Sequence, residues 1–104
     1  MNLPSLSFPC KHVNVYRMYY VYLIKSKNTG ELYYGFTSDL RRRMMEHNRG
    51  DSFSTKSAIP WEIIYYEAYL AEEDARNREK QLKRYAQGLG HLKNRLHYSL
   101  RKRK

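Results

Sequence analysis

Hydrophobic positions after about residue 18 fall into three short runs that are typical of β-strands. Tyr19–Lys25 and Glu31–Phe36 are rich in aromatic and β-branched residues, and Asn28-Thr29-Gly30 between them supplies turn chemistry. These two runs predict a β-hairpin, and the apolar run Trp61–Tyr69 predicts a third strand. The polar, turn-rich stretch from 50 to 60 is expected to be a loop.

The register of the hairpin decides which side chains meet. If the turn is centred on its first two residues, Tyr22 lies opposite Gly35 and Ile24 lies opposite Tyr33. Tyr22 and Tyr33 then lie diagonally on one face of the sheet, because alternate residues of a strand share a face. A shift of one residue would separate them.

A helix is predicted between the second and third strands, over about Asp39–Arg49. Thr37 or Ser38 supplies a capping side chain, Asp39 lies in the first turn, and Gly50 ends the helix. Side chains four residues apart on this helix share a face.

A second helix is predicted over about Glu72–Tyr85, with Ala75, Leu82 and Ala86 on its inward stripe. Glu79 falls on the same stripe. A carboxylate there is costly unless a positive or hydrogen-bonding group meets it, so Glu79 is expected to have such a partner.

A third helix, basic and amphipathic, is predicted over about 91–104. Gly88 and Gly90 mark a break, after which leucines recur every four residues. Up to residue 75 the chain has nine basic and nine acidic residues, whereas the rest has eleven basic residues and one acidic residue, so the net charge of +10 is entirely C-terminal. Such a block releases counterions when it meets phosphates, which favours nucleic acid over a solvated tail or a membrane surface.

A chain of 104 residues has room for one domain. We expect an N-terminal extension over 1–17 and a single domain over 18–104. Cys10, the sole cysteine, cannot form an internal disulfide, and with only His12 nearby it falls short of a zinc site. No run of ~18 apolar residues or signal peptide is visible, so a cytoplasmic protein without membrane association is expected.

Two tyrosine-containing strand motifs, a basic pair and a helical glutamate follow one another in order: Val21–Ile24, Tyr33–Gly35, Arg43 with His47, and Glu79. Arg43 lies eight residues after Gly35, and His47 lies four further on. This set resembles the GIY-YIG nuclease superfamily, particularly its small single-domain bacterial, excision-repair-nuclease-like members. The similarity covers about residues 19 to 86.

Three positions depart from the family's pattern. Tyr20 stands where the first glycine of the name motif would be, Tyr34 replaces its central isoleucine, and Phe36 occupies a position often filled by lysine. Without that lysine, one candidate phosphate contact or base is missing, and His47 becomes the more important candidate for that role. Some members also use an asparagine near the end of the core, and Asn94, the local candidate, is not included in the catalytic set.

The resemblance implies an α+β fold, a three-stranded antiparallel sheet with flanking helices. It also implies a metal-dependent DNA endonuclease that leaves 5′-phosphate and 3′-hydroxyl ends, with Mg²⁺ or Mn²⁺ as cofactor, and it assigns the base or water-positioning role mainly to Tyr22.

Phosphodiester hydrolysis needs an activated water, charge neutralisation at the phosphoryl oxygens and stabilisation of the leaving oxygen. Glu79 offers hard oxygen ligands for the metal ion, and Arg43 offers two-point contact with a phosphate. Tyr22 or Tyr33 can position the water or, beside a cation, act as phenolate. His47 titrates near neutrality and can assist proton transfer or contact phosphate. Which group removes the proton stays open.

Each of these residues also has an ordinary structural interpretation. Strand tyrosines usually pack in a core or on a sheet, and this chain has eleven. Arg43 closes a run of three arginines typical of a solvated helical face, and His47 could be a capping or packing residue. Glu79 could pair with Lys83, four residues later, for only about 0.2–0.5 kcal/mol.

Basic side chains near the motif and along the C-terminal helix are the predicted DNA contacts: Arg41, Arg42, Lys83, Arg84, Lys93, Arg95, Arg101, Lys102, Arg103 and Lys104. The leading hypothesis is an endonuclease in DNA repair, recombination or processing, and the tyrosines favour single-stranded or branched substrates slightly. One alternative is a catalytically inactive nucleic-acid-binding protein of the same fold. Another is an adaptor whose basic helix docks an acidic protein, although no protein partner is evident in the sequence.

Overall fold

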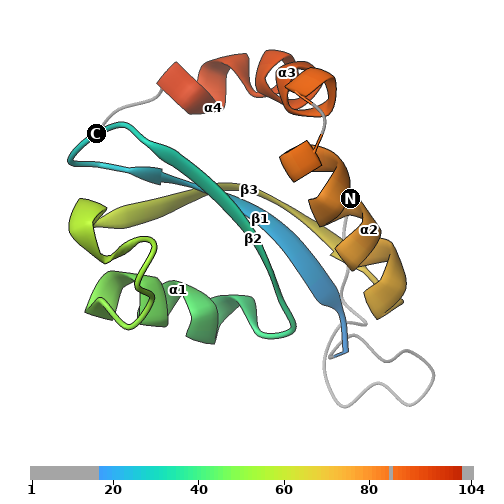
Figure 1. Cartoon of the computed structure of the whole chain (residues 1–104), viewed down its shortest axis with the longest axis horizontal. Helices are drawn as coiled ribbons and strands as arrows, with labels where there is room; N and C mark the ends of the chain where they lie inside the picture. The colour runs from blue at the N-terminus through green and yellow to red at the C-terminus, as the bar shows by residue number, and fades with distance from the viewer. Residues whose placement is uncertain (1–16, 85, 102–104) are drawn as a thin grey trace, which may run out of the picture.

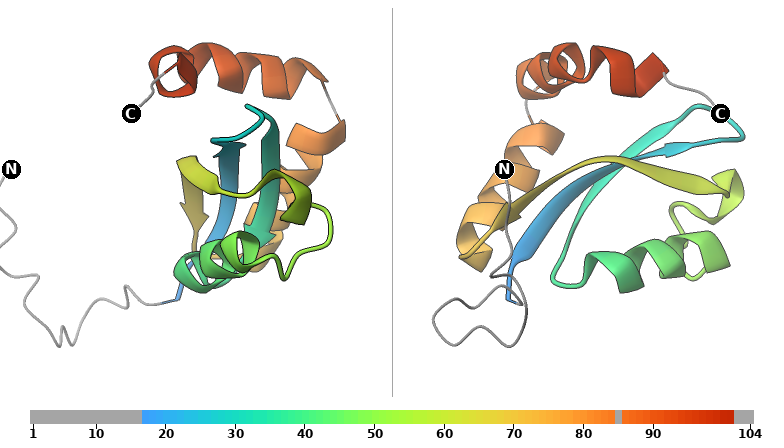
Figure 2. Two further views of the ribbon diagram at one scale, coloured as in Figure 1. Left: turned by 90° about the vertical axis from the view of Figure 1, so that its left-hand side faces the viewer. Right: turned by 180° about the vertical axis from the view of Figure 1, so that it is seen from behind.

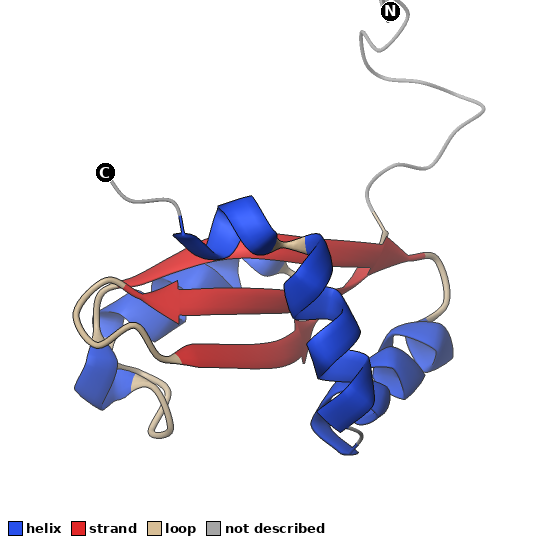
Figure 3. Cartoon of the chain, turned by 90° about the horizontal axis from the view of Figure 1, so that it is seen from above, coloured by secondary structure: helices blue, strands red, loops and turns tan. Residues whose placement is uncertain are grey.

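Three antiparallel strands form the centre of the structure, which is a computed structural model. It describes residues 17–84 and 86–101, and the side chains of residues 84 and 86–89 are outside the description. They are β1 (Tyr19–Ser26), β2 (Leu32–Thr37) and β3 (Trp61–Tyr69), in the order β2-β1-β3. The most apolar strand, β1, is therefore central, and β2 and β3 are the edges (Figure 3). The predicted α+β fold with a three-stranded antiparallel sheet is confirmed.

The predicted hairpin register is also confirmed. Tyr22 pairs with Gly35 and Ile24 pairs with Tyr33. The register follows from local turn chemistry: the hydroxyl oxygen of Ser26 accepts the N–H groups of Asn28 and Thr29 at 3.0 and 2.9 Å, and Gly30 adopts a φ of 80° that favours glycine.

Helices cover both faces of the sheet (Figure 1). On one face, Val21 and Leu23 of β1 pack against leucines and an alanine from α2 (Glu72–Arg84) and from the segment that holds α3 (Ala86–Arg95) and α4 (His97–Arg101). On the other face, Tyr22 and Ile24 pack against α1 (Leu40–Arg49) and the short 3₁₀ helix η2 (Lys56–Ala58). Both views of Figure 2 show α1 and the α3–α4 pair on opposite sides of the sheet.

The start of α1 differs slightly from the prediction. Asp39 is the N-cap and not a first-turn residue, because its carboxylate accepts the N–H of Arg42 at 3.1 Å. The hydroxyl of Thr37 accepts the N–H of Asp39 at 3.0 Å and so orients the cap. Gly50 ends the helix in the left-handed conformation, as predicted.

The C-terminal helix predicted over 91–104 was wrong in its boundaries. Gly88 and Gly90 lie inside α3, which begins at Ala86, and α4 follows at His97. A glycine inside a helix costs only about 1 kcal/mol, and burial of Leu92 and Leu96, at 1% and 9% exposure, offsets that cost. Residues 102–104 lie outside the described part of the chain.

None of the helices between residues 17 and 101 that the structure describes has the length and apolar character needed to cross a membrane.

Candidate active site

Tyr22 lies at the centre of the face covered by α1, with only 1% of its surface exposed. Its ring leans over β2 at Gly35. A Cβ atom at position 35 would lie 2.6 Å from the Tyr22 hydroxyl oxygen and 2.8 Å from its ring carbon Cζ. Glycine is therefore required at this position, because any side chain would displace the tyrosine.

A buried chain of hydrogen bonds connects Tyr22 with α1 and the loop that follows it. The Tyr22 hydroxyl lies 2.8 Å from Nε2 of His47, and Nδ1 of His47 lies 2.8 Å from Oγ1 of Thr55. His47 and Thr55 are both fully buried. The Thr55 hydroxyl donates to the carbonyl of Ser52 at 3.5 Å, so its oxygen is left to accept a hydrogen bond from the Nδ1–H of His47.

These contacts assign the tautomer of His47. With Nδ1–H donating to Thr55, a neutral imidazole has its lone pair on Nε2, and the Tyr22 hydroxyl donates to it. The ring of His47 is thereby oriented to receive the Tyr22 proton.

The electrostatics of the site keep that proton on Tyr22 at rest. Burial lowers the pKa of His47 to about 4, and the positive charge of Arg43 lowers it further than the nearby Glu46 raises it. The expectation that His47 titrates near neutrality was therefore wrong. Burial also raises the pKa of Tyr22 to about 12, an effect that contact with the Arg43 guanidinium partly offsets. At neutral pH both groups are uncharged.

Arg43 is held beside Tyr22 by two further contacts. Its guanidinium donates to Oε1 of Glu46 at 2.9 Å and to Oγ of Ser52 at 3.4 Å. Burial acts to lower the pKa of Arg43, but the hydrogen bonds that it donates to Glu46 and Tyr22, together with their charges, raise it by more, so the guanidinium stays charged. Its side chain remains 30% exposed, which leaves a planar cation available at the edge of the buried network.

Tyr33 shares this face with Tyr22, as the register predicts. Its ring meets that of His47 edge to face, with the centroids 5.4 Å apart, and lies 6.3 Å from the ring of Trp61. Trp61 in turn donates its ring N–H to the Thr55 carbonyl at 2.8 Å, which fixes the backbone of the loop that holds His47.

Glu79 lies on α2, which packs against the face of the sheet opposite α1. Arg76 and Lys83 of this helix lie over the rings of Phe36 and Tyr34, 4.1 and 6.0 Å from the ring centroids, so α2 runs along the edge strand β2. Burial is the main cause of the raised pKa of Tyr22, and the negative charge of Glu79 raises this pKa slightly further.

The partner expected for Glu79 is Lys83, whose Nζ lies 3.0 Å from Oε2. The Glu79 side chain is 18% exposed and that of Lys83 is 51% exposed. Among residues 17–84 and 86–101, no group of three or more acidic, histidine or cysteine side chains gathers at one place. The donor set fits a hard ion held by one carboxylate, with water and phosphate as its other ligands, provided that the exposed lysine moves aside.

Glu46, Ser52 and Thr55 belong to this network but were missed from the sequence. Glu46 had a signal, because it lies three residues after Arg43 on a helix. The other two lie in a polar loop, where nothing in the residue pattern indicates that Thr55 is completely buried.

The predicted DNA-contacting residues fall on two surfaces. Arg41 and Arg42 are exposed on α1, whereas the exposed Lys93, Arg95 and Arg101 belong to α3 and α4 on the opposite face of the sheet. Lys83 is engaged with Glu79, and Arg101 lies 2.9 Å from Nε2 of His97. The remaining four lie outside the described side chains: Arg84, Lys102, Arg103 and Lys104.

At this site a strand tyrosine donates to a helical histidine, with an arginine beside the tyrosine. Residues 18–88 match the model of the GIY-YIG catalytic domain. The chain belongs to the GIY-YIG family, a superfamily of endonucleases that act on nucleic acid and generally use divalent metal ions.

Similar proteins carry family names that state no activity. The chain is 37% identical over 68 residues to a UPF0213 protein of Staphylococcus epidermidis, a match that covers 64% of this chain and 82% of the relative. It is 32% identical over 68 residues to a UPF0213 protein of Haloquadratum walsbyi, covering 64% and 75% of the two chains. The solution NMR structure of the UPF0213 protein BH0048 from Bacillus halodurans matches with a TM-score of 0.43 and 30% identity, over 73% of this chain and 85% of that one.

Proposed function

We propose that the protein is a divalent-metal-dependent endonuclease that hydrolyses phosphodiester bonds of DNA. The observation that carries this proposal is the buried relay from Tyr22 through His47 to Thr55, which ends beside a partly exposed arginine. A fully satisfied polar chain of this kind inside a small core costs desolvation, and a purely packing role for Tyr22 would not require it.

In the proposed reaction, a water molecule gives a proton to the Tyr22 oxygen while the Tyr22 proton moves to Nε2 of His47. The oxygen of that water attacks phosphorus, the bond from phosphorus to the 3′ oxygen breaks, and the 3′ oxygen takes a proton from solvent. The products are a 5′-phosphate and a 3′-hydroxyl. His47 then returns its proton to solvent.

Arg43 links substrate binding to this proton transfer. Its positive charge is one cause of the low pKa of His47. A phosphate that binds the guanidinium compensates that charge, so the pKa of His47 rises when substrate is present. His47 therefore becomes a stronger base only in the complex, and the free enzyme rests with both groups neutral.

Glu79 is the proposed metal ligand. A bound Mg²⁺ or Mn²⁺ ion would neutralise charge on the phosphoryl and leaving oxygens. Since the metal ion leaves most of its coordination sphere to water and phosphate, one protein carboxylate is sufficient to anchor it.

The proposed substrate is DNA that contains unpaired bases. We assign the protein to DNA repair, recombination or processing in the cytoplasm, with single-stranded or branched DNA preferred over intact duplex. The exposed ring of Tyr66 supports this preference, because an unpaired base can stack on an aromatic ring and a paired base is already stacked.

The test is cleavage of end-labelled single-stranded, duplex and branched DNA by the purified protein in Mg²⁺ or Mn²⁺, beside an RNA control and a reaction with chelator. Glu79→Ala is expected to abolish cleavage and leave DNA affinity largely intact, because the carboxylate holds metal and does not attract the polyanion. Glu73→Ala is the matched control, a glutamate in the first turn of the same helix. Wild-type cleavage by Glu79→Ala would overturn the metal assignment.

A second candidate function is nucleic-acid binding without turnover. The ion pair between Lys83 and Glu79 favours it, because a lysine that stays in place would occupy the metal position. This function predicts tight DNA binding with no nicking in any divalent metal.

A further inference from the structure

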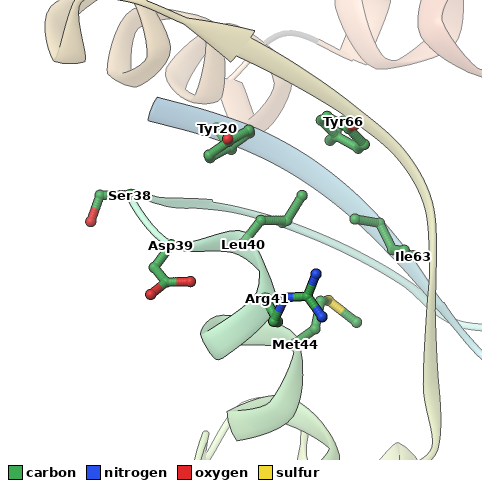
Figure 4. Close-up of a pocket in the computed structure, with 8 residues that line it drawn as sticks. All are labelled: Tyr20, Ser38, Asp39, Leu40, Arg41, Met44, Ile63 and Tyr66. Atoms are coloured by element: carbon green, nitrogen blue, oxygen red, sulfur yellow. The ribbon is translucent and has the colours of Figure 1, made fainter. Parts of the chain in front are cut away.

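A shallow cleft of about 630 Å³ lies between α1 and the sheet, on the same face of the sheet as Tyr22. It is lined by side chains of β1, β3, α1 and the turn before α1: Tyr20, Ser38, Asp39, Leu40, Arg41, Met44, Ile63 and Tyr66. Figure 4 shows the two tyrosines side by side above the helix, with the Arg41 guanidinium near Met44 and the polar Ser38 and Asp39 at one end.

The cleft combines an aromatic wall with an apolar floor and a charged rim. The rings of Tyr20 and Tyr66 meet edge to face with their centroids 5.8 Å apart, and Tyr66 is 53% exposed. Leu40, Met44 and Ile63 supply apolar surface. A half-exposed ring above an apolar floor suits a flat ligand that stacks.

Arg41 gives the cleft a cation. Within residues 17–84 and 86–101, Arg41 forms no ion pair with a carboxylate, although Arg42 and Arg43 both approach Glu46. Since residues of a helix advance by about 100° each, Arg41 and Arg43 leave α1 on nearly opposite flanks. One cation therefore faces the catalytic relay and the other faces the cleft.

The exposed tyrosine of the cleft also neighbours Tyr22 in the sheet. Tyr66 pairs directly with Tyr22 across β1 and β3, so the two rings occupy neighbouring positions on one face of the sheet. Paired strands lie only ~4.8 Å apart. A base held against Tyr66 would therefore lie about one strand spacing from Tyr22, on the flank of α1 that carries Arg41.

We propose that this cleft is a subsite for an unpaired nucleobase of single-stranded DNA, which stacks on Tyr66 while Arg41 contacts a flanking phosphate. Asp39 and Ser38 at the rim accept hydrogen bonds from the edge of the base, although Asp39 also accepts the Arg42 N–H. Duplex DNA cannot use the subsite, because its bases are already stacked on their neighbours. The inference rests on the proposed function, since it names where that enzyme holds its substrate.

The test is equilibrium binding of a fluorescent oligothymidylate of about 12 nucleotides and of a blunt-ended duplex. A chelator in the buffer prevents cleavage during the measurement. Tyr66→Ala should weaken single-strand binding by roughly 5- to 150-fold, which corresponds to the loss of one base–aromatic stack, and leave duplex binding within about twofold. Tyr66→Phe should retain wild-type affinity. Tyr98→Ala is the matched control, because Tyr98 is 83% exposed but lies on α4 across the sheet, and it should change neither affinity.

A second measurement uses Tyr66→Trp as a reporter. Trp61, the natural tryptophan, is 5% exposed and gives a constant background. Fluorescence of the new indole should be quenched as the oligonucleotide binds. Arg41→Ala should reduce the magnitude of the slope of log affinity against log salt by about 0.7, whereas Lys27→Ala, in the distant turn after β1, should not.

Three results would overturn the inference: equal weakening of single-strand and duplex binding by Tyr66→Ala, unchanged single-strand affinity, or an unquenched Tyr66→Trp at saturating oligonucleotide. If Tyr66→Ala instead changed only self-association in sedimentation experiments, the face would belong to a second copy of the chain. Base stacking at Tyr66 without cleavage by the wild type would support the subsite and refute the proposed nuclease. Cleavage by the wild type at a rate that Tyr66→Ala does not change, with unchanged single-strand affinity, would support the proposed nuclease and refute the subsite.

Discussion

The two faces of the sheet carry different kinds of polar group. On the face covered by α1, the hydroxyl of Tyr22, the ring of His47 and the hydroxyl of Thr55 are buried and hydrogen-bonded in one orientation. On the face covered by α3 and α4, the cations Lys93 and Arg95 are exposed. The first arrangement holds polar groups in fixed positions, as the proposed reaction requires, whereas the second supplies positive charge at the surface.

This difference separates the residues proposed for bond cleavage from those proposed to attract DNA. A buried network is sensitive to the loss of a single atom, because an unpaired polar group in a core cannot turn to water. Exposed cations act together through a field that salt screens, so each one contributes little. Substitutions in the relay on the α1 face should therefore change turnover, and substitutions of the exposed cations on α3 and α4 should change affinity.

Among substitutions on the α1 face, the largest effect is expected at Arg43. Arg43→Ala should lower the cleavage rate at saturating DNA by roughly 10²–10³-fold, the range found when one transition-state donor is removed, with a much smaller loss of affinity. Arg43→Lys should not restore the rate, because a point charge lacks two-point geometry. Single-turnover rates and binding constants are the measurements, and Arg49→Ala, an exposed residue of the same helix paired with Asp51, is the control. Full rescue by lysine would reduce the role of Arg43 to phosphate attraction.

Gly35→Ala tests the same face through packing alone. The added methyl group would lie 2.6 Å from the Tyr22 hydroxyl, so the tyrosine must move away from His47. We expect a destabilisation of about 1–3 kcal/mol in urea unfolding, together with a rate loss of about tenfold or more. Gly90→Ala is the matched control, because nothing lies within 4 Å of a Cβ there, and it should be neutral or slightly stabilising. Equal behaviour of the two variants would contradict the close approach.

Thr55→Val should have a smaller effect on the rate, since it removes only the group that orients His47. The Nδ1–H of His47 then lacks its acceptor, and we expect a rate loss of about tenfold and a destabilisation of about 1–3 kcal/mol. Thr55→Ser keeps the hydroxyl and should restore the rate. Nitrogen NMR shifts of His47 report the tautomer directly, and an unchanged proton position in Thr55→Val would refute the orienting role.

The smallest change per residue is expected on the C-terminal side. Neutralising Arg101, Lys102, Arg103 and Lys104 should weaken DNA binding. The magnitude of the slope of log affinity against log salt should fall by about 0.7–0.9 for each phosphate that the variant no longer neutralises. Cleavage at saturating DNA should persist. An unchanged slope together with a loss of turnover would place this segment in the active site and remove the distinction between the two faces.

Local patterns predicted much of this architecture. Alternation along the strands and the turn chemistry at Asn28-Thr29-Gly30 were sufficient for the hairpin register, because both act between residues close in sequence. The helix start predicted near residue 90 was wrong because it also relied only on residues close in sequence. Two glycines signal a break locally, but burial of Leu92 and Leu96 against the sheet outweighs their cost.

The order of the chain alone determined that Tyr22 lies opposite Gly35, that Arg43 and His47 share a helical face, and that the excess positive charge is C-terminal. Only the tertiary structure decided that Thr55 is completely buried against His47, that this imidazole has a pKa of about 4, and that α3 and α4 lie on the face opposite the relay. Spacing along a strand or helix sets which side chains are neighbours. Burial and the pKa values that follow from it depend on what the rest of the chain places around those side chains, and no local pattern contains that information.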